Sequence, residues 1–383
     1  MSSSVNKPCR AQAGSRSPLI GVAVAALALL VASCTTQTGT TEPDEGPADS
    51  NETSADQVED TEAQPEDTEA QPEDDEPADL VEVNFQLDFL YAGYQAPFFY
   101  ALEQGLWEER GLDVTVREGN GSANGIQTIV GGVNHLGLFD RPTMAVSRES
   151  HADLISVLGI DNRGGWAVAT PAELGIQSPE DLVGTTIATQ LGGADGTILP
   201  AFLEANGLSD SDLTIESVDP AAKTTLLQSG RVDGATYINY AQVPQIEASG
   251  VDLNTMLWSD HGLPLVGAGL VASRSWAEDN PEIVSAFIGG LSQALEASTT
   301  DPEAVVDAFE LHVSEFDREV ALAQLELVIE ALQGLGTEGQ PLGWQSEESW
   351  GATISTLETV GMLSEASDIE DYFDNSYLLE ASS

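Results

Sequence analysis

The sequence is poor in cysteine and histidine, and this excludes several kinds of site. Its 383 residues contain two cysteines, Cys9 and Cys34, too few for a disulfide scaffold or a cysteine-based zinc site. The four histidines, at 135, 151, 261 and 312, have no paired spacing for a metal ion. A Gly-x-Ser-x-Gly nucleophile motif is also missing from the sequence. We therefore predict no metal site, no cofactor and no catalytic residue.

Positive charge is equally scarce. The chain has 12 Lys and Arg residues against 64 Asp and Glu, which gives a formal net charge of −52. A duplex nucleic-acid partner needs a basic footprint, and attachment to anionic lipid needs the same, so neither partner is expected. Hydrophobic residues make up 41% of the chain, which is enough to build packed cores. The length predicts about two lobes or domains.

The N-terminal 33 residues have the features of a secretory signal. Three basic residues and no acid accompany an apolar run of roughly 14 residues, Leu19 to Ala32, which is short for a transmembrane span. The run closes on Val31-Ala32-Ser33-Cys34, which resembles a bacterial lipobox. We expect residues 1–33 to be removed. A lipid on Cys34, with palmitate among its acyl chains, would then anchor the protein at the outer face of the cell membrane. The alternative is an ordinary signal peptide with an incidental Cys34.

Residues 34–80 are predicted to form a disordered acidic tether. Positions 35–80 contain 17 acids and no Lys or Arg. The heptapeptide Asp-Thr-Glu-Ala-Gln-Pro-Glu occurs in tandem at 60–66 and 67–73. A period of seven is typical of coiled coils, but each copy carries a proline and lacks the apolar pair of a heptad. The segment is therefore expected to repel itself and stay extended.

From residue 81 onward, strands alternate with helices. Apolar residues at every second position from Val81 to Phe89 predict the first strand, and the spacing of Phe98, Leu102 and Leu106 predicts a helix that Gly111 ends. Further strands are predicted at 112–118, 135–139, 154–160, 184–189, 213–218, 233–238 and after about 266, and helices at 196–206, 220–229, 281–297, 302–311, 317–333 and 346–360. This alternation indicates an α/β fold with mostly parallel sheets, in which ligands bind beyond the carboxyl ends of the strands.

Four stretches in order along the chain carry a resemblance to a known family. They are 88–114, which begins Asp88-Phe-Leu-Tyr-Ala-Gly-Tyr-Gln-Ala-Pro; 178–187, Ser-Pro-Glu-Asp-Leu-Val-Gly-Thr-Thr-Ile; 199–208, Leu-Pro-Ala-Phe-Leu-Glu-Ala-Asn-Gly-Leu; and 218–235, which begins Val-Asp-Pro-Ala-Ala-Lys and ends Gly-Arg-Val-Asp-Gly-Ala. Together they resemble the SsuA/TauA/ThiY-like substrate-binding proteins of ABC importers, which include taurine, alkanesulfonate and thiamine-pyrimidine binders.

The resemblance implies a two-lobed, periplasmic-binding-protein-like α/β fold of type II. Two mixed, mostly parallel sheets would flank a cleft between the lobes, and the C-terminal third would be helical. Residues 81–165 and 266–383 would form one lobe, and 166–265 the other. The lobes would be joined by two crossovers and would close on a small ligand.

The resemblance also implies a function. The chain would capture a small solute and deliver it to an ABC permease. We expect a monomer that contacts the membrane only through the lipid. Aromatic residues and carboxylates at the predicted loop ends favour a planar, amine-bearing heterocycle such as a thiamine-pyrimidine precursor. The alternatives are an alkanesulfonate, taurine or nitrate binder, a flavin binder, a sensor lipoprotein without a permease, and an enzyme like the thiamine-pyrimidine synthase of the same fold family.

Four loops would face the cleft if the positions of the family are carried over. The first, 91–95, follows the first strand, and the second, 119–124, precedes a helix. The third, 191–195, precedes a helix of the other lobe, and the fourth, 237–240, lies at the end of a strand. The predicted ligand-binding residues are Asp88, Tyr91, Tyr94, Gln95, Asn120, Ser122, Asp140, Trp166, Asp195, Tyr237, Asn239 and Tyr240. Trp166 lies near the expected first crossover, and the aromatic rings would stack on a planar ligand while Asp140 or Asp195 paired with an amino group.

Several of these residues have structural alternatives. Asp195 could cap the helix that starts at Gly196, and Asp140 could form a local ion pair with Arg141. The segment from Gly119 to Gly125 is one residue too long for a dinucleotide fingerprint and follows the second strand. Lys223, the only lysine after the signal, is expected at a helix start in a surface or capping role.

The charge of the body generates a prediction about salt. Outside the signal and tether, 47 acids stand against nine Lys and Arg, a net of −38. Self-repulsion should destabilise the fold at low salt, whereas at molar salt the Debye length falls to about 3 Å and the repulsion is screened. We expect the thermal midpoint of unfolding to rise between low and molar NaCl, as it would in a protein from a saline habitat. A midpoint that stays constant or falls would contradict this interpretation.

Overall fold

The computed structural model describes residues 80–150, 152–190 and 193–381. These residues belong to the second of two compact units of the chain, Glu73–Ser383. The expected signal sequence 1–33, the lipidation site Cys34 and the tether up to residue 79 lie outside the described residues.

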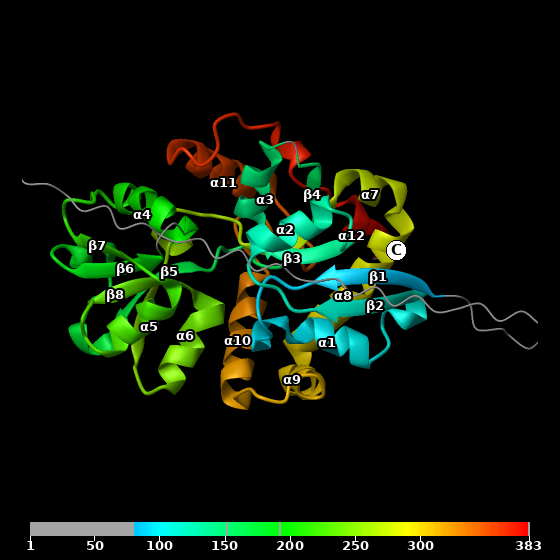
Figure 1. Ribbon diagram of the computed structural model, residues 1–383, viewed down its shortest axis with the longest axis horizontal. Coiled ribbons are helices and arrows are strands. Elements are labelled where there is room, and N and C mark those ends of the chain that lie inside the picture. The colour runs from blue at the N-terminus through cyan, green and yellow to red at the C-terminus, as the bar shows by residue number, and fades with distance from the viewer. Residues whose placement is uncertain (1–79, 151, 191–192, 382–383) are drawn as a thin grey trace, which may run out of the picture. The chain divides into compact units, whose positions relative to one another are not determined.

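A first mixed sheet carries the N-terminal strands (Figure 1). Its strands are, in spatial order, β2 (Leu112–Arg117), β1 (Val81–Gln86), β3 (Leu136–Asp140), β10 (Ala268–Ser273) and β4 (Leu154–Gly159). Strand β1 is parallel to β2 and β3, whereas β10 is antiparallel to both β3 and β4. The carboxyl ends of β1, β3 and β4 therefore lie at one edge of the sheet.

A second sheet repeats the same plan. Its spatial order is β7 (Thr214–Val218), β6 (Thr186–Gln190), β8 (Gly234–Ile238), β5 (Trp166–Pro171) and β9 (Leu253–Leu257). Strand β6 is parallel to β7 and β8, and β5 is antiparallel to β8 and β9. In each sheet a single strand thus opposes the other four, which confirms the predicted mixed, mostly parallel architecture.

The chain crosses between the sheets twice, after Gly159 and before Ala268. The two connections are hydrogen-bonded to each other, because the Gly267 N–H donates to the Asp161 carbonyl (2.7 Å) and the Asp161 N–H to the Ala268 carbonyl (2.8 Å). The expected lobe boundaries, 165/166 and 265/266, fall within these connections. We refer to the first sheet with its helices as lobe 1 and to the second as lobe 2.

Helices cover both sheets (Figure 1). Their bounds are α1 Ala96–Glu103, α2 Ser122–Val130, α3 Arg141–Arg148, α4 Ala194–Ala205, α5 Pro220–Gln228, α6 Asn239–Ala248, α7 Arg274–Asp279, α8 Pro281–Thr300, α9 Pro302–Glu310, α10 Arg318–Ala331, α11 Glu347–Thr359 and α12 Ser376–Ala381. The helical C-terminal third is therefore confirmed. Helix α10 stands between the lobes and packs against α6 of lobe 2 as well as against lobe 1.

The hydrophobic core explains why the C-terminal helices return to lobe 1. One cluster packs Phe85 and Leu138 of the first sheet against α1, α8, α9 and α10. A second cluster runs through both lobes, because Phe139 of the first sheet, Phe202 of α4 and Trp350 of α11 share it. Long amphipathic helices in this position bury the remaining apolar face of the sheet.

Most predicted elements are present within two residues of their expected ends. The sequence patterns missed the strands β5 and β9 and the helices α3, α6, α7 and α12. Strands β5 and β9 each pair antiparallel and carry short apolar runs without clear alternation, so period two gave no signal. Helices α3, α7 and α12 are short, and α6 carries Pro244 in its interior, which weakens a helical pattern.

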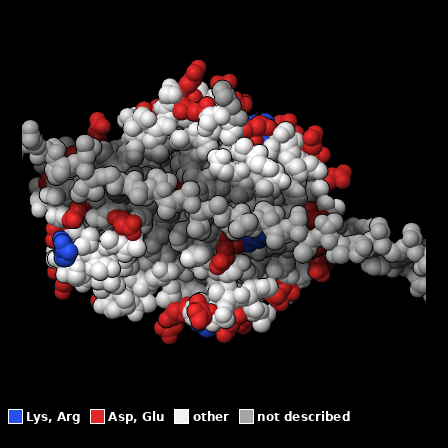
Figure 2. Space-filling model, viewed as in Figure 1, with Lys and Arg blue, Asp and Glu red and all other residues white. Residues whose placement is uncertain are grey.

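Acidic side chains dominate the charged surface. Figure 2 shows many Asp and Glu and few Lys or Arg over the visible, described part of one face. Among the described helices, none is long and apolar enough to cross a membrane.

Candidate functional site

A cavity lies where the two sheet edges meet. It holds about 330 Å³ of empty space, part of it open to solvent. Lobe 1 contributes the residues that follow β1, β3 and β4, and lobe 2 contributes the start of β5 and the end of β8. The lining residues are Asp88, Ser122, Asp140, Asp161, Gly165, Trp166, Ile238, Tyr240, Gly267 and Ala268. The position beyond the carboxyl ends of strands is where α/β folds bind ligands.

Asp88 is held by two neighbours on the short 3-10 helix η1 (Gly93–Gln95). The Tyr94 hydroxyl donates to both carboxylate oxygens at 3.1 Å, and Gln95 Nε2 donates to Oδ1 at 2.7 Å. Burial nevertheless raises the pKa of Asp88 to about 6, although both hydrogen bonds lower it. The carboxylate is thus ionised at neutral pH but without a cation of its own.

Asp140 ends β3 and caps α3. Its Oδ2 accepts from the backbone N–H of Thr143 at 2.9 Å, while Oδ1 has no hydrogen-bond partner in the described part of the chain. The Asp140 N–H donates to the Ser122 hydroxyl at 2.9 Å, which places the start of α2 beside this carboxylate. Burial raises the pKa of Asp140, against the hydrogen bonds from Thr143 that lower it. Asp140 therefore has an acceptor oxygen to offer a ligand.

Asp161 follows β4 and shapes the first crossover. Its carboxylate accepts backbone N–H groups from Gly164 and Gly165, both at 2.7 Å. The side chain is buried, and burial raises its pKa although the nearby Arg141 lowers it. Gly164 has φ +79°, a conformation that glycine adopts without strain, so the tight turn around the carboxylate fits the sequence.

Arg141 is the cation behind the cavity, and its donors are already used. Nε donates to the Gly267 carbonyl at 2.9 Å, Nη1 to Gln345 at 3.2 Å, and Nη2 to the Asp161 carbonyl. Burial lowers the pKa of Arg141 to about 10, which leaves it charged at neutral pH. The alternative of a local Asp140–Arg141 ion pair is wrong, because the guanidinium instead fixes both crossovers.

Two aromatic residues complete the cavity wall. Trp166 opens β5 and stacks on Trp258 with ring centroids 5.8 Å apart. Tyr240, in the first turn of α6, lies 5.1 Å from the ring of Tyr94 across the lobes. Burial keeps the pKa of Tyr240 well above its ordinary value, so its hydroxyl stays neutral. The site combines aromatic faces with three carboxylates.

The structure brings together five of the predicted site residues at this cavity: Asp88, Ser122, Asp140, Trp166 and Tyr240. Tyr94 and Gln95 lie behind Asp88 and support it. Asn239 lines an adjoining cavity that shares Tyr240 with the first.

Tyr91 and Asn120 lie elsewhere. Tyr91 packs edge-on against Phe99 (5.1 Å) and lines a separate groove beside α6 and α10. Asn120 is exposed, and its carbonyl accepts from the Asn124 side chain. Neither residue is part of the lining of the cavity between the sheets.

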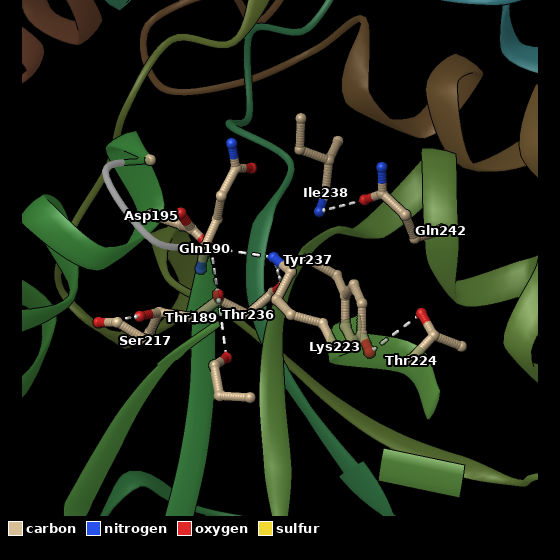
Figure 3. A network of polar contacts seen from close by, with 12 residues as sticks. Thr189, Gln190, Asp195, Ser217, Lys223, Thr224, Thr236, Tyr237, Ile238 and Gln242 are labelled. Carbon is tan, nitrogen blue, oxygen red and sulfur yellow. Dashed lines mark hydrogen bonds and ion pairs between the residues drawn. The ribbon is translucent and has the colours of Figure 1, made fainter. Parts of the chain in front are cut away.

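Asp195 and Tyr237 belong to a buried polar network inside lobe 2 (Figure 3). Asp195 Oδ2 accepts from the Gln190 N–H (3.0 Å), from Lys223 Nζ (3.0 Å) and from the Thr236 hydroxyl. Lys223 Nζ lies 5.2 Å from the centre of the Tyr237 ring. The expectation that Lys223 is a surface or capping residue is wrong, because it is buried and neutralises Asp195.

Sequence reasoning missed Asp161. The predicted strand 154–160 places it at a carboxyl end in the same way as Asp88 and Asp140, so the signal was present in the pattern. Its neighbours Gly267 and Ala268 enter the lining from the antiparallel strand β10 and had no such signal.

The carboxylates of this cavity are not arranged as a metal site. Among the described residues, no group of three or more His, Cys, Asp or Glu side chains could hold a metal ion. Carboxylate oxygens of this kind can accept hydrogen bonds and offer negative charge to a bound molecule.

Comparisons with known proteins identify the family and the fold of this chain. The family described as NMT1/THI5 like matches residues 92–305. The formylaminopyrimidine-binding protein of Halalkalibacterium halodurans is 26% identical over 79% of this chain and 91% of its own length. The riboflavin-binding protein RibY of Chloroflexus aurantiacus is 23% identical over 78% and 86%. The periplasmic aliphatic sulphonate binding protein SsuA of Escherichia coli superposes with a TM-score of 0.60 at 16% identity, over 76% of this chain and 91% of that one.

The raised pKa of Asp88 predicts that Asp88→Asn stabilises the ligand-free protein. Because the folded-state pKa, about 6, exceeds the ordinary 3.8, ionised Asp88 destabilises the fold, and stability falls as pH rises through this window. At pH 7.5 we expect a gain of roughly 1–2 kcal/mol in the free energy of unfolding, shrinking toward zero below pH 4. Denaturant unfolding at both pH values measures it, and a loss of stability at pH 7.5 would refute the assignment.

The buried ion pair of Lys223 and Asp195 in lobe 2 predicts a loss of stability on substitution, in contrast to the gain expected at Asp88. Lys223→Met leaves Asp195 buried without its cation, so we expect a loss of about 3–5 kcal/mol. Adding Asp195→Asn removes the unpaired charge but keeps an acceptor for the Gln190 N–H, and the double variant should recover part of the loss. Urea unfolding of the two variants decides the matter; equal losses would mean that the charges do not interact.

Proposed function

The chain belongs to the NMT1/THI5-like family, and from that membership we propose that it is the solute-binding protein of an ABC importer. Its ligand in this proposal is a small, planar, amine-bearing N-heterocycle such as a thiamine-pyrimidine precursor. The formylaminopyrimidine-binding relative supports this ligand class, as does the chemistry of the cavity.

The observation that carries the proposal is the convergence of Asp88, Asp140 and Asp161 on one cavity walled by Trp166 and Tyr240. Carboxylates accept hydrogen bonds from amino and ring N–H groups, and aromatic faces pack on a flat ring. A ligand with several N–H donors would compensate the negative charge of three acids that line one cavity. The space in this cavity that a water-sized molecule can reach is about 50 Å³, well below the usual size of a ligand pocket. A single ring would therefore require less opening of the lobes than a flavin.

The same observation disfavours the anionic alternatives, an alkanesulfonate, taurine or nitrate. The guanidinium of Arg141 is used by the crossovers. Arg163 is paired with Asp260 at 2.8 Å, and Lys223 with Asp195. An anion would enter a cavity with three carboxylates and no uncommitted cation among these three.

The mechanism in this proposal is capture by closure. The ligand would bind at the edge of lobe 1 and complete its contacts when Trp166 and Tyr240 of lobe 2 close over it, and the closed form would dock on the permease. No chemical step is included. The enzyme alternative would need a free lysine and a cysteine-rich motif, whereas Lys223 is held in an ion pair and no cysteine follows Cys34.

Location and partners complete the proposal. A lipid on Cys34 would hold the monomer at the outer face of the cell membrane, and the acidic tether would let it reach its permease. The protein surface itself would not bind the membrane, because its charge repels anionic lipid. A sensor lipoprotein without a permease is the second candidate, and a permease gene beside this one would argue against it.

A ligand screen tests the proposal. Thermal shift in molar NaCl, confirmed by calorimetry, would compare hydroxymethylpyrimidine, formylaminopyrimidine, thiamine, riboflavin, taurine, alkanesulfonates and nitrate. A ligand at 100 times its dissociation constant adds about 2.7 kcal/mol of stability, which moves the midpoint clearly. We expect a shift with an aminopyrimidine and none with the anions. A shift with a sulfonate or nitrate alone would overturn the ligand class.

Matched variants test the cavity. Asp88→Asn and Asp140→Asn should each weaken binding of the pyrimidine hit by at least tenfold, because each replaces a charged acceptor; Asn remains a good cap for α3. Asp113→Asn, on the exposed edge strand β2, removes the same charge far from the cavity and should leave affinity unchanged. Equal affinities for all three variants would contradict the assignment.

A further inference from the structure

One buried side chain, that of Gln324, forms hydrogen bonds to both lobes beside the ligand cavity. Gln324, on α10, is 2% exposed. Its Oε1 accepts the backbone N–H of Gly93 at 2.8 Å, and its Nε2 donates to the carbonyl of Ala241 at 2.7 Å. Gly93 belongs to lobe 1 and Ala241 to α6 of lobe 2. The oxygen and the nitrogen of one side-chain amide therefore form hydrogen bonds to different lobes.

Gln324 is built into the lobe 1 side of this contact. Helix α10 packs closely on η1, so closely that a Cβ added at Gly93 would lie 2.2 Å from the Ala321 carbonyl oxygen. Helix α10 also packs on α9 and α8, which cover the first sheet. If the lobes move apart, Gln324 therefore stays with Gly93, and the bond to Ala241 is the one that breaks.

The same three residues of η1 reach the ligand cavity. Gly93 binds Gln324, and the next two residues, Tyr94 and Gln95, donate to the carboxylate of Asp88. The Tyr94 ring also lies 5.1 Å from that of Tyr240, the residue before Ala241. A change at Asp88 can therefore reach the inter-lobe bond in two ways. It can act through η1 on Gly93, and through the contact of the Tyr94 and Tyr240 rings on Ala241.

The contact between α6 and α10 is suited to opening. A small cavity lined by Tyr240, Leu327 and Glu330 adjoins it on one side and has room for about one water molecule, about 20 Å³. A groove with about 770 Å³ of empty space, part of it open solvent, is lined by Gly93, Gln245 and Gln324. Water in this groove can therefore reach Gln324 and replace the bond to Ala241 when the lobes move apart.

We propose that Gln324 is a latch that holds the lobes in the closed arrangement, and that η1 couples this latch to the carboxylate of Asp88. Gln324 is then a positioning residue that touches no ligand. The role of the latch in capture rests on the proposed function, whereas the latch itself does not.

Two variants of Gln324 distinguish a role in holding the lobes together from a role within lobe 1 alone. Gln324→Glu keeps an oxygen to accept the Gly93 N–H but sets a carboxylate against the Ala241 carbonyl. Gln324→Leu removes both bonds. Gln245→Glu is the matched control, because it adds the same charge to the same groove from an exposed position on α6. Hydrogen exchange of the full chain without ligand, read by mass spectrometry, would follow residues 92–96 and 239–248.

In Gln324→Glu we expect exchange in 239–248 to accelerate about fivefold in the first turn of α6, whose N–H groups have no acceptor within the helix, while 92–96 stays protected. Fivefold is the factor that corresponds to one hydrogen bond of about 1 kcal/mol. Gln324→Leu should accelerate both segments, and Gln245→Glu neither. Exchange in 239–248 that matches the wild type in Gln324→Glu would overturn the latch, whether or not Gln324→Leu folds. Because no ligand is added, this result is independent of the ligand screen, and weakened pyrimidine binding by Gln324→Glu would then connect the latch to capture.

Discussion

Three carboxylates that line one cavity, none of these three in an ion pair and with the buried guanidinium of Arg141 behind them, are the constraint on which this molecule depends. Asp88, Asp140 and Asp161 follow parallel strands whose carboxyl ends lie at one sheet edge, so the topology itself brings them together. Burial raises the pKa of each of them. The protein tolerates this through hydrogen bonds from Tyr94, Gln95, Thr143 and the crossover glycines, which satisfy the carboxylates without neutralising them. A site that stays negative and partly unsatisfied favours a ligand rich in N–H donors.

The surrounding structure keeps this arrangement in place. Arg141 uses its guanidinium on the carbonyls of both crossovers, which fixes the junction between the lobes instead of discharging the cavity. The separate pair of Asp195 and Lys223 neutralises lobe 2 internally. The single lysine of the body therefore serves the structure, and the candidate site remains acidic within a protein of net negative charge.

Much of the fold could be predicted from the sequence, because elements with a clear period, such as β1 and α8, leave an unambiguous pattern. The antiparallel strands β5 and β9 could not be predicted, since their apolar runs have no alternation. For the site, the rule that polar residues after parallel strands meet at one edge found Asp88 and Asp140 and was not applied to Asp161. The rule was wrong for Asp195, because no sequence pattern indicated that Lys223, 28 residues later, would be buried against it. Tyr91 was misplaced because the chain turns away between Asp88 and η1, a local path that depends on packing against α10.

The most direct test of this account is a carbon-13 NMR titration of the aspartate side-chain carboxyls, with and without hydroxymethylpyrimidine, in which Asp88→Asn assigns the Asp88 signal. The account predicts that Asp88 of the free protein titrates near pH 6 and that the bound ligand lowers this pKa, because its N–H groups stabilise the ionised form. An Asp88 that titrates near its ordinary value of 3.8, unchanged by the ligand, would contradict the view that unsatisfied carboxylates define the site.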